Sequence, residues 1–148
     1  MKSIYYKQER SWTCGAASMR IVLSNLGINK SENEIIRLLK TNKVRGTLSR
    51  NFALLANKLK LKYISGNANS INDLRPLLKK GFMVIVCYYI PKDKVDHYSV
   101  INKIGKKNVY FLDPWYGADY ALSIRYFDSV WKSDNRWENQ KKWFIALK

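Results

Sequence analysis

The sequence predicts an α+β fold, in which N-terminal helices pack on an antiparallel β-sheet. Apolar residues recur at helical spacing in the first part of the chain, whereas the second half carries a β-branched and aromatic run, Phe82 to Ile90, followed by a hairpin pattern. Helices first and antiparallel strands second is the order of an α+β domain. The 148 residues contain no repeat, low-complexity tract or linker, so we expect one domain over residues 1–148.

Three helices are expected in the first part of the chain. Thr13 can cap a helix that starts near Cys14 and ends at Gly27. The segment Ser31-Glu32-Asn33-Glu34 resembles a capping box and precedes a second apolar run at helical spacing. A third helix is expected at residues 48–59, where leucine and phenylalanine side chains share one face.

The rest of the chain predicts strands with two short helices among them. We expect strands at residues 61–65, 82–90, 97–104, 108–112 and 142–147, and helices at 70–80 and 124–131. Pro76 fits the helix at 70–80 only in its first turn. The run at 82–90 has the composition of a central strand. Gly105-Lys106-Lys107 joins the next two strands into a hairpin.

Composition limits the classes of function. The two cysteines, Cys14 and Cys87, lie far apart, neither is part of a Cys-x-x-Cys motif, and there is one histidine. A zinc site would lack its usual ligands, so we expect no metal and no organic cofactor. The chain shows neither an apolar signal segment nor an apolar run near the ~20 residues of a membrane span, which predicts a cytoplasmic protein with no integral membrane segment.

The chain is strongly basic, with 27 Lys and Arg against 11 Asp and Glu and a net charge of +16 spread along its length. Such a field attracts polyanions, membranes or acidic substrates. A solvated, lysine-rich surface is the simpler interpretation. Contact with a polyanion through this surface, including nucleic-acid binding, stays open as a hypothesis, and a steep loss of affinity with added salt would be its signature.

Cys14 and His97 are the candidates for covalent chemistry. A cysteine in the first turn of a helix lies at the positive end of the macrodipole, which stabilises a thiolate. Gly15 and Ala16 keep side-chain bulk away, so that a carbonyl can approach. His97 is the only histidine and therefore the one good proton carrier near neutral pH. Cys87 lies in the apolar run at 82–90, and we expect it in the core.

Asp113 and Gln8 complete the candidate site. Asp113 follows the strand that pairs with the strand of His97, so it would lie across the ladder and orient the imidazole. Asp96 is nearer in sequence but points to the opposite face of the strand, and Asp93 could serve only if the preceding loop folds back. The amide of Gln8, six residues before the cysteine, can donate to an oxyanion together with the cysteine's own backbone N–H.

Four short motifs occur in order along the chain: Gln8-x5-Cys14-Gly15-x-Ala17, Gly46-Thr47, His97-Tyr98-x-Val100 and Asp113-Pro114-x-x-Gly117. In this order and spacing they resemble the peptidase C39 group of papain-like cysteine peptidases, over residues 4 to 131. The group is best known as the leader-cleaving domain of bacteriocin-exporting ABC transporters. The resemblance implies a papain-like fold. It also implies roles as nucleophile, base, orienting group and oxyanion donor for Cys14, His97, Asp113 and Gln8.

The sequence departs from the transporter members in two ways. Those members often carry an acidic residue directly before the cysteine, where this chain has Thr13. They are also fused to membrane and ATPase segments, whereas this chain ends at Lys148, so we expect a free-standing domain. Cleavage of double-glycine leader peptides is therefore not implied by the resemblance.

These observations predict a cysteine peptidase. The reaction would be acyl transfer from a peptide or isopeptide carbonyl to Cys14, followed by hydrolysis, and a leader or precursor peptide is one candidate substrate. Two alternatives stay open: a non-catalytic module that binds peptides in the same cleft, as in relatives that have lost the cysteine, and an acyltransferase that passes the acyl group to an amine.

The sequence says less about the residues that surround the candidate site. Trp12 and Trp115 could equally wall the cleft or pack as ordinary core or rim aromatics. Loops at Asn42 to Thr47 and Trp115 to Tyr120 are expected to shape the pocket. The tryptophans at 131, 137 and 143 are expected to pack the C-terminal segment.

Overall fold

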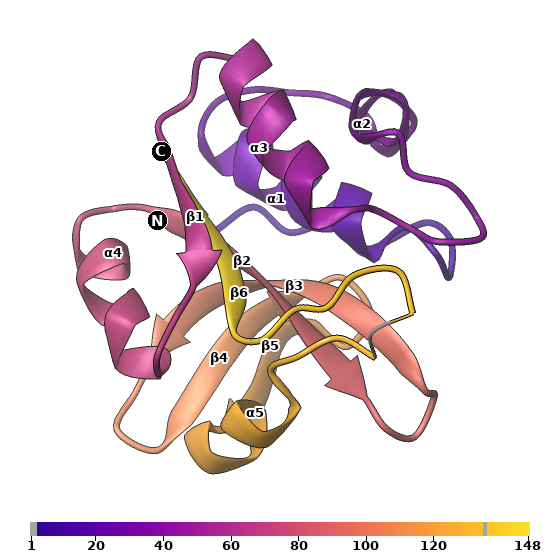
Figure 1. Ribbon diagram of the computed structural model, residues 1–148. Coiled ribbons are helices and arrows are strands. Elements are labelled where there is room, and N and C mark those ends of the chain that lie inside the picture. Colours follow the sequence, from indigo (N-terminus) through magenta and orange to yellow (C-terminus); the bar gives the residue numbers. More distant parts are fainter. Residues whose placement is uncertain (1–2, 135) are drawn as a thin grey trace.

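The computed structural model describes residues 3–134 and 136–148, and it confirms the predicted α+β fold (Figure 1). Three helices come first: α1 (Cys14–Asn25), α2 (Glu32–Leu39) and α3 (Ser49–Lys58). They are followed by β1 (Tyr63–Asn67), the 3-10 turn η1 (Ile71–Leu74), α4 (Arg75–Lys79), β2 (Met83–Ile90), β3 (Val95–Ile104), β4 (Asn108–Asp113), β5 (Gly117–Ser123), α5 (Ile124–Val130) and β6 (Trp143–Leu147).

The helix starts follow local sequence signals. At α2 the predicted capping box is present: Ser31 Oγ accepts from the Glu34 N–H at 3.1 Å, and Glu34 Oε1 accepts from the Ser31 N–H at 3.3 Å. The segment expected as one helix at 70–80 is instead η1 followed by α4. Pro76 stands at the start of α4, where its missing N–H costs no helical hydrogen bond.

The six strands form one antiparallel sheet in the order β1-β6-β2-β3-β4-β5. β2 lies between β6 and β3, as its unbroken apolar run predicts for a central strand. The predicted hairpin is the pair β3 and β4, in which Val100 faces Leu112 and Ile104 faces Val109. This hairpin fixes where His97 and Asp113 lie, because one residue sits near the start of β3 and the other ends β4.

Strand β5 was not predicted. The segment from Trp115 to Tyr120 was expected to be a loop, but the chain turns at Gly117 and pairs with β4 from there on. Gly117 has a φ of 125°, a conformation that residues with a Cβ rarely adopt. The expected pocket loop is therefore reduced to a short turn between β4 and β5.

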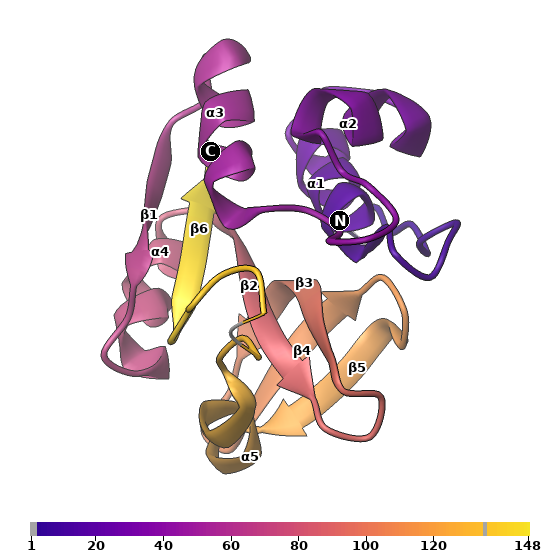
Figure 2. The ribbon, with the colours of Figure 1, turned by 45° about the vertical axis from the view of Figure 1, so that its right-hand side comes forward.

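The sheet carries a hydrophobic core on each face. The helices α1, α2 and α3 pack on one face, where Ile85, Cys87 and Val100 are buried (Figures 1 and 2). The other face buries Val86 and Tyr88, among others, and is covered by η1 and α5. Cys87 is thus a core residue, as expected from its strand. Alternation along β2 separates these two sets of side chains.

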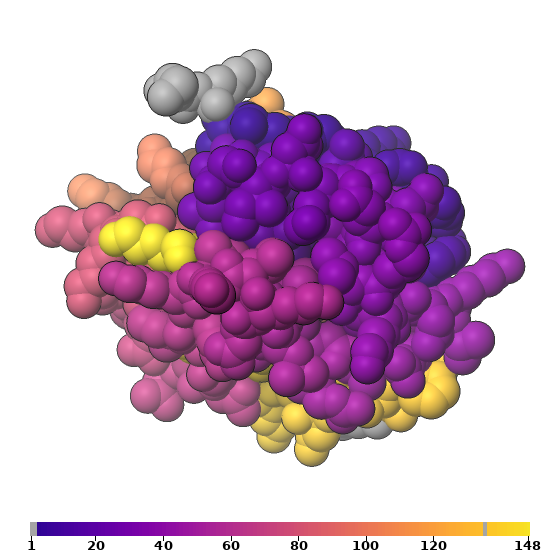
Figure 3. Space-filling model, turned by 90° about the horizontal axis from the view of Figure 1, so that it is seen from above, coloured from indigo at the N-terminus to yellow at the C-terminus, as the bar shows by residue number. Residues whose placement is uncertain are grey.

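The helical first half of the chain covers one side of the molecule. Seen from above, segments coloured indigo to magenta occupy most of the surface (Figure 3). The start of α1 contacts the sheet near the start of β3, where the Tyr98 backbone N–H donates to Cys14 Sγ. No helix of the described residues is long and apolar enough to cross a bilayer.

Candidate active site

Cys14 is the first residue of α1, and its side chain is partly exposed. The Tyr98 backbone N–H, on β3, donates to Cys14 Sγ at 3.5 Å. Thr13 occupies the cap position, but the prediction that it caps the helix through its side chain is wrong. Its hydroxyl donates to the Arg10 carbonyl at 2.9 Å and accepts from the Arg10 N–H at 3.1 Å. Thr13 therefore closes the turn that precedes the cysteine.

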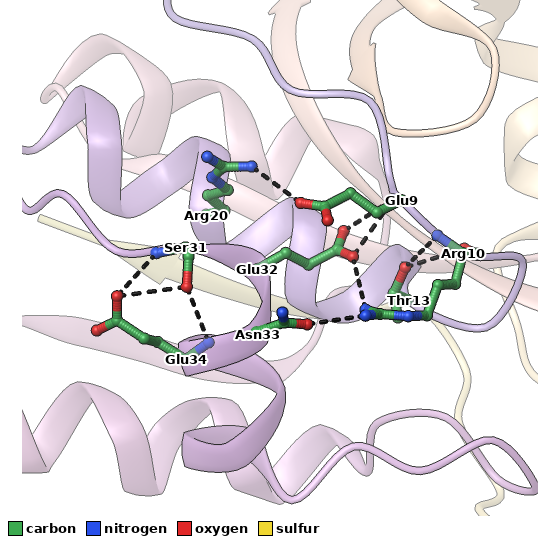
Figure 4. A network of polar contacts seen from close by, with 8 residues as sticks. All are labelled: Glu9, Arg10, Thr13, Arg20, Ser31, Glu32, Asn33 and Glu34. Carbon is green, nitrogen blue, oxygen red and sulfur yellow. Dashed lines mark hydrogen bonds and ion pairs between the residues drawn. The ribbon is translucent and has the colours of Figure 1, made fainter.

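The segment before α1 is fastened to the start of α2 (Figure 4). The Glu9 N–H donates to both carboxylate oxygens of Glu32, at 3.1 and 3.3 Å, and the Arg10 guanidinium pairs with the same carboxylate at 3.5 Å. Arg10 also donates to Asn33 Oδ1 at 2.9 Å. Glu32 is buried, and sequence reasoning took it only as part of a capping box. These contacts hold the segment that carries Gln8 in a defined position next to Cys14.

Gln8 is buried and lines the same cleft as Cys14, and its backbone N–H donates to the Pro114 carbonyl at 3.0 Å. Its Nε2 donates one hydrogen bond to the Arg10 carbonyl at 2.7 Å. An amide nitrogen carries two N–H groups, so one donor is left for a further acceptor. Gln8 Oε1 is buried without a partner. The side chain is therefore held by one of its donors and keeps another available.

His97 and Asp113 are in direct contact: His97 Nε2 and Asp113 Oδ1 are 2.9 Å apart. The register explains this contact. Val100 faces Leu112, so Asp113 comes opposite Ser99, and His97 lies two residues along the same face of β3. An ionised carboxylate only accepts, so Nε2 is the protonated ring atom and Nδ1 is left to face the thiol.

Asp96 makes no such contact. Its Oδ1 accepts from the Asp134 N–H at 2.9 Å. Burial, with the charge of Asp134 as the second cause, raises the pKa of Asp96 to about 6. The expectation that Asp96 points away from the face of His97 agrees with this arrangement.

The carboxylate of Asp113 is fully buried and accepts five hydrogen bonds. Beside His97, Oδ1 accepts from the backbone N–H groups of Trp115 and Tyr116, both at 2.9 Å. Oδ2 accepts from the Tyr88 hydroxyl at 2.9 Å and from Ser99 Oγ at 2.8 Å. Sequence reasoning missed both hydroxyls. The β3–β4 register and the alternation of side chains would have pointed to Ser99.

Charge explains the protonation of this pair. Burial alone would lower the pKa of His97, but hydrogen bonds to Asp113 and Cys14, together with the charges of these two groups, outweigh it and raise the pKa to about 10. Burial likewise acts to raise the pKa of Asp113, but its bond to His97 and the charge of the ring lower it below the ordinary value. The pair is therefore an imidazolium next to a carboxylate at neutral pH.

One cleft of about 450 Å³ joins Gln8, Cys14 and His97. Asp113 is not part of its wall and lies behind the imidazole. Trp12 and Trp115 both line the cleft, which settles their two open interpretations in favour of the cleft wall. More of the wall comes from residues 43–48, which include the predicted loop after α2, and from residues 93–96, 133–134, 136–138 and 140. Ser11, Cys87, Ile90 and Tyr98 also line the cleft.

Trp137 does not pack in the interior as the sequence analysis predicted. It was expected to pack in the C-terminal segment, yet 53% of its surface is exposed and it lines the cleft. Trp131 and Trp143, by contrast, are buried as expected, and the Trp131 indole N–H donates to the Trp143 carbonyl at 2.9 Å. The segment around Trp137 is tied to α3, because the Ser49 N–H donates to Glu138 Oε1 at 2.8 Å.

Gly15 serves a packing role that differs from the one expected. A Cβ at Gly15 would lie 2.5 Å from Thr47 Oγ1 and 3.2 Å from the Tyr98 ring. Glycine thus lets the loop that carries Thr47 press against α1, and the Tyr98 hydroxyl donates to the Thr47 carbonyl at 2.8 Å. The glycine brings one wall of the cleft close to the cysteine.

Within residues 3–134 and 136–148, no cluster of three or more His, Cys, Asp or Glu side chains is arranged to hold a metal ion.

The chain matches the model of the peptidase C39 family over residues 2–134, and it belongs to that family. It is 34% identical over 110 residues to an uncharacterised protein of Methanothermobacter thermautotrophicus, a stretch that covers 74% of this chain and 70% of that protein.

Solved structures share the fold. The peptidase domain of Streptococcus ComA, a bi-functional ABC transporter involved in quorum sensing, superposes with a TM-score of 0.77 at 24% identity, covering 99% of this chain and 98% of that one. A double-glycine-motif protease from an AMS/PCAT transporter, solved with its leader peptide, superposes with a TM-score of 0.76 at 19% identity, covering 99% of this chain and 91% of that one. A C39-like peptidase from Bacillus anthracis superposes with a TM-score of 0.74 at 14% identity, covering 99% of this chain and 94% of that one.

Proposed function

We propose that this protein is a cysteine peptidase in which Cys14 is the nucleophile, His97 the general acid and base, Asp113 the group that orients the imidazole, and Gln8 an oxyanion donor. The observation that carries the proposal is the bond between His97 and Asp113 at a cleft that Cys14 and Gln8 also line. Membership of a peptidase family supports the same reaction class.

The reaction follows from the positions of these groups. Cys14 Sγ, as a thiolate, attacks the carbonyl carbon of a peptide bond, and the carbonyl oxygen becomes an oxyanion. The second Nε2–H of Gln8 and the Cys14 backbone N–H would stabilise that oxyanion, since neither is bonded within its own helix or turn. The imidazolium gives the Nδ1 proton to the departing amine, which leaves an acyl-enzyme. Water then gives a proton to the imidazole and attacks the thioester, and the acid leaves with the thiol restored.

A precursor or leader peptide is the substrate class that we propose. The AMS/PCAT protease of similar fold was solved in complex with a leader peptide, and Cys14 of this protein lines a cleft of about 450 Å³. We place the reaction in the cytoplasm, and we propose that residues 1–148 act as one domain. The surplus of lysine and arginine offers a surface that an anionic partner could contact.

The experiment is cleavage of a peptide library, read by mass spectrometry, with wild type, Cys14→Ala and Cys87→Ala. Cys87 is the matched control because it is the other thiol and is only 3% exposed. We expect wild type and Cys87→Ala to cleave the same peptides and Cys14→Ala to cleave none. Cleavage by Cys14→Ala would overturn the mechanism.

The same spectra separate the two alternatives. Hydrolysis adds the mass of water across the cut bond, whereas an acyltransferase yields a product that has gained an amine. If wild type cuts nothing but binds peptides as tightly as Cys14→Ala, the protein is a peptide-binding module.

A further inference from the structure

We propose that Tyr88 and Ser99 are positioning residues of the site: their hydroxyls hold one oxygen of Asp113, so that the other oxygen faces the ring of His97. The inference rests on the proposed function, and it adds two residues that none of the sequence motifs specifies. Both side chains come from strands, Tyr88 from β2 and Ser99 from β3, so the support is built into the rigid part of the fold.

The two oxygens of Asp113 have separate sets of donors. Oδ1 receives the His97 ring and two backbone N–H groups, whereas Oδ2 receives the hydroxyls of Tyr88 at 2.9 Å and Ser99 at 2.8 Å. A carboxylate rotates about one bond, and donors fixed on both of its oxygens prevent that rotation. The hydroxyls therefore determine the angle at which Oδ1 meets Nε2 of the histidine.

Both hydroxyls are held so that they can act only as donors to this oxygen. Burial and the charge of Asp113 raise the pKa of Tyr88 far above its ordinary value, so the phenol keeps its proton. The Tyr88 ring contacts His97 edge to face at a centroid distance of 5.4 Å, and Phe111 and Phe127 pack against it at 5.8 and 6.0 Å. Ser99 is fully buried.

A buried carboxylate needs such donors to stay ionised. Desolvation favours its neutral form, and each hydroxyl that donates to it favours the charged form. Without Tyr88 and Ser99 the carboxylate would be easier to protonate and free to turn. Either change weakens its bond to the imidazole. A role confined to satisfying buried polar groups would affect stability but not the histidine.

The test uses Tyr88→Phe, Ser99→Ala and the double variant, with Ser99→Thr as the conservative change that keeps a hydroxyl. Two controls delete a hydroxyl elsewhere. Ser18→Ala removes a fully buried hydroxyl that lacks a partner, and Tyr126→Phe removes one from a half-exposed ring. Thermal unfolding of each variant shows whether it is folded. If Tyr88→Phe does not fold, Ser99→Ala and Ser99→Thr decide the question.

The main readout is the ring NMR signal of His97, which is unambiguous because the chain has one histidine. In wild type we expect an imidazolium at neutral pH, with a ring pKa of about 10 and a strongly deshielded Nε2 proton. In the double variant we expect this proton to be less deshielded and the pKa of the ring to fall, because the carboxylate that stabilises the imidazolium is held less firmly. Acid protonates Asp113 and so removes its hydrogen bond to His97. We expect the pH of this change to rise by about one unit in the double variant, because the two hydroxyls no longer favour the charged carboxylate.

The second readout is kinetic. Each hydroxyl deletion should lower kcat about tenfold and leave KM within about twofold, since the hydroxyls do not line the cleft. Ser99→Thr should restore kcat. An unchanged Nε2 proton signal, ring pKa, acid titration and kcat in a folded double variant would overturn the inference. The NMR readout needs no substrate, so absence of peptidase activity in wild type would count against the proposed function and leave this inference to be judged on its own.

Discussion

His97 Nε2 and Asp113 Oδ1 lie 2.9 Å apart, and both side chains are almost wholly removed from solvent. The contact joins the start of β3 to the end of β4 and leaves Nδ1 of the ring for the thiol of Cys14. It is also the main reason, after burial has acted in the opposite direction, why the pKa of His97 is raised to about 10. This raised pKa makes the stability of the folded protein depend on pH.

The protein should lose stability as the pH rises from about 6.5 to about 10. The folded state holds the His97 proton more tightly than the unfolded chain does, so the stabilisation is complete below the ordinary pKa of 6.5 and is lost as the pH passes through about 10. Urea unfolding at a series of pH values measures this change. The difference between wild type and His97→Gln isolates it from the lysines, and an equal pH dependence in both proteins would contradict the assignment.

Gln8→Ala should lower kcat by about a hundredfold and change KM little, because an oxyanion donor acts in the transition state and not in the ground state. Gln140→Ala is the matched control. Gln140 is also a buried glutamine that lines the cleft, and the proposed mechanism gives it no role. Steady-state kinetics on one cleaved peptide compares the two. Equal effects of the two substitutions would remove Gln8 from the mechanism.

Gly15→Ala should destabilise the protein by about 1–3 kcal/mol, because the new Cβ would meet Thr47 at 2.5 Å. Thr47 cannot easily turn away, since its hydroxyl is 2.6 Å from that of Thr41 in a buried hydrogen bond. Gly66→Ala is the control, as a Cβ there meets nothing within 4 Å. The free energies of unfolding should differ clearly between the two variants, and matching values would show that the loop yields at no cost.

Trp137→Ala should raise KM for a cleaved peptide about tenfold or less and leave kcat nearly unchanged. The side chain is exposed on the cleft wall and has no part in the proton transfers. Truncating an aromatic contact removes binding energy from substrate and transition state alike. Trp131→Ala does not serve as a control because that side chain is in the core. A better one is Val44→Ala, because Val44 also lines the cleft, is 78% exposed and offers a smaller contact. A large fall in kcat for Trp137→Ala would mean that the wall also orients the scissile bond.

The sequence predicted the parts of the fold and site that depend on local pattern. The capping box at Ser31, the central strand and the β3–β4 hairpin are all local. The alternation and register of side chains follow from the hairpin. The sequence alone therefore predicts that His97 and Asp113 lie within reach of each other.

What escaped the sequence depends on contacts between distant segments. Tyr88 reaches Asp113 across 25 positions, and Trp137 lines the cleft because its segment is fastened to the start of α3. Strand β5 was missed because its edge position allows a mixed polar composition that resembles a loop. The side chain of Thr13 also behaved unexpectedly, since its hydroxyl bonds backward to Arg10 and not forward into the helix.

The measurement that tests the central claim most directly is the rate at which iodoacetamide alkylates Cys14 at neutral pH, followed by peptide mapping in wild type and in His97→Ala. It needs no knowledge of the substrate, and Cys87 in the same chain is the buried thiol for comparison. If His97 activates the thiol, Cys14 reacts at least about tenfold faster than glutathione, and the rate falls by a similar factor in His97→Ala. A Cys14 that reacts no faster than glutathione, or equally fast without the histidine, would contradict the proposed catalytic pair.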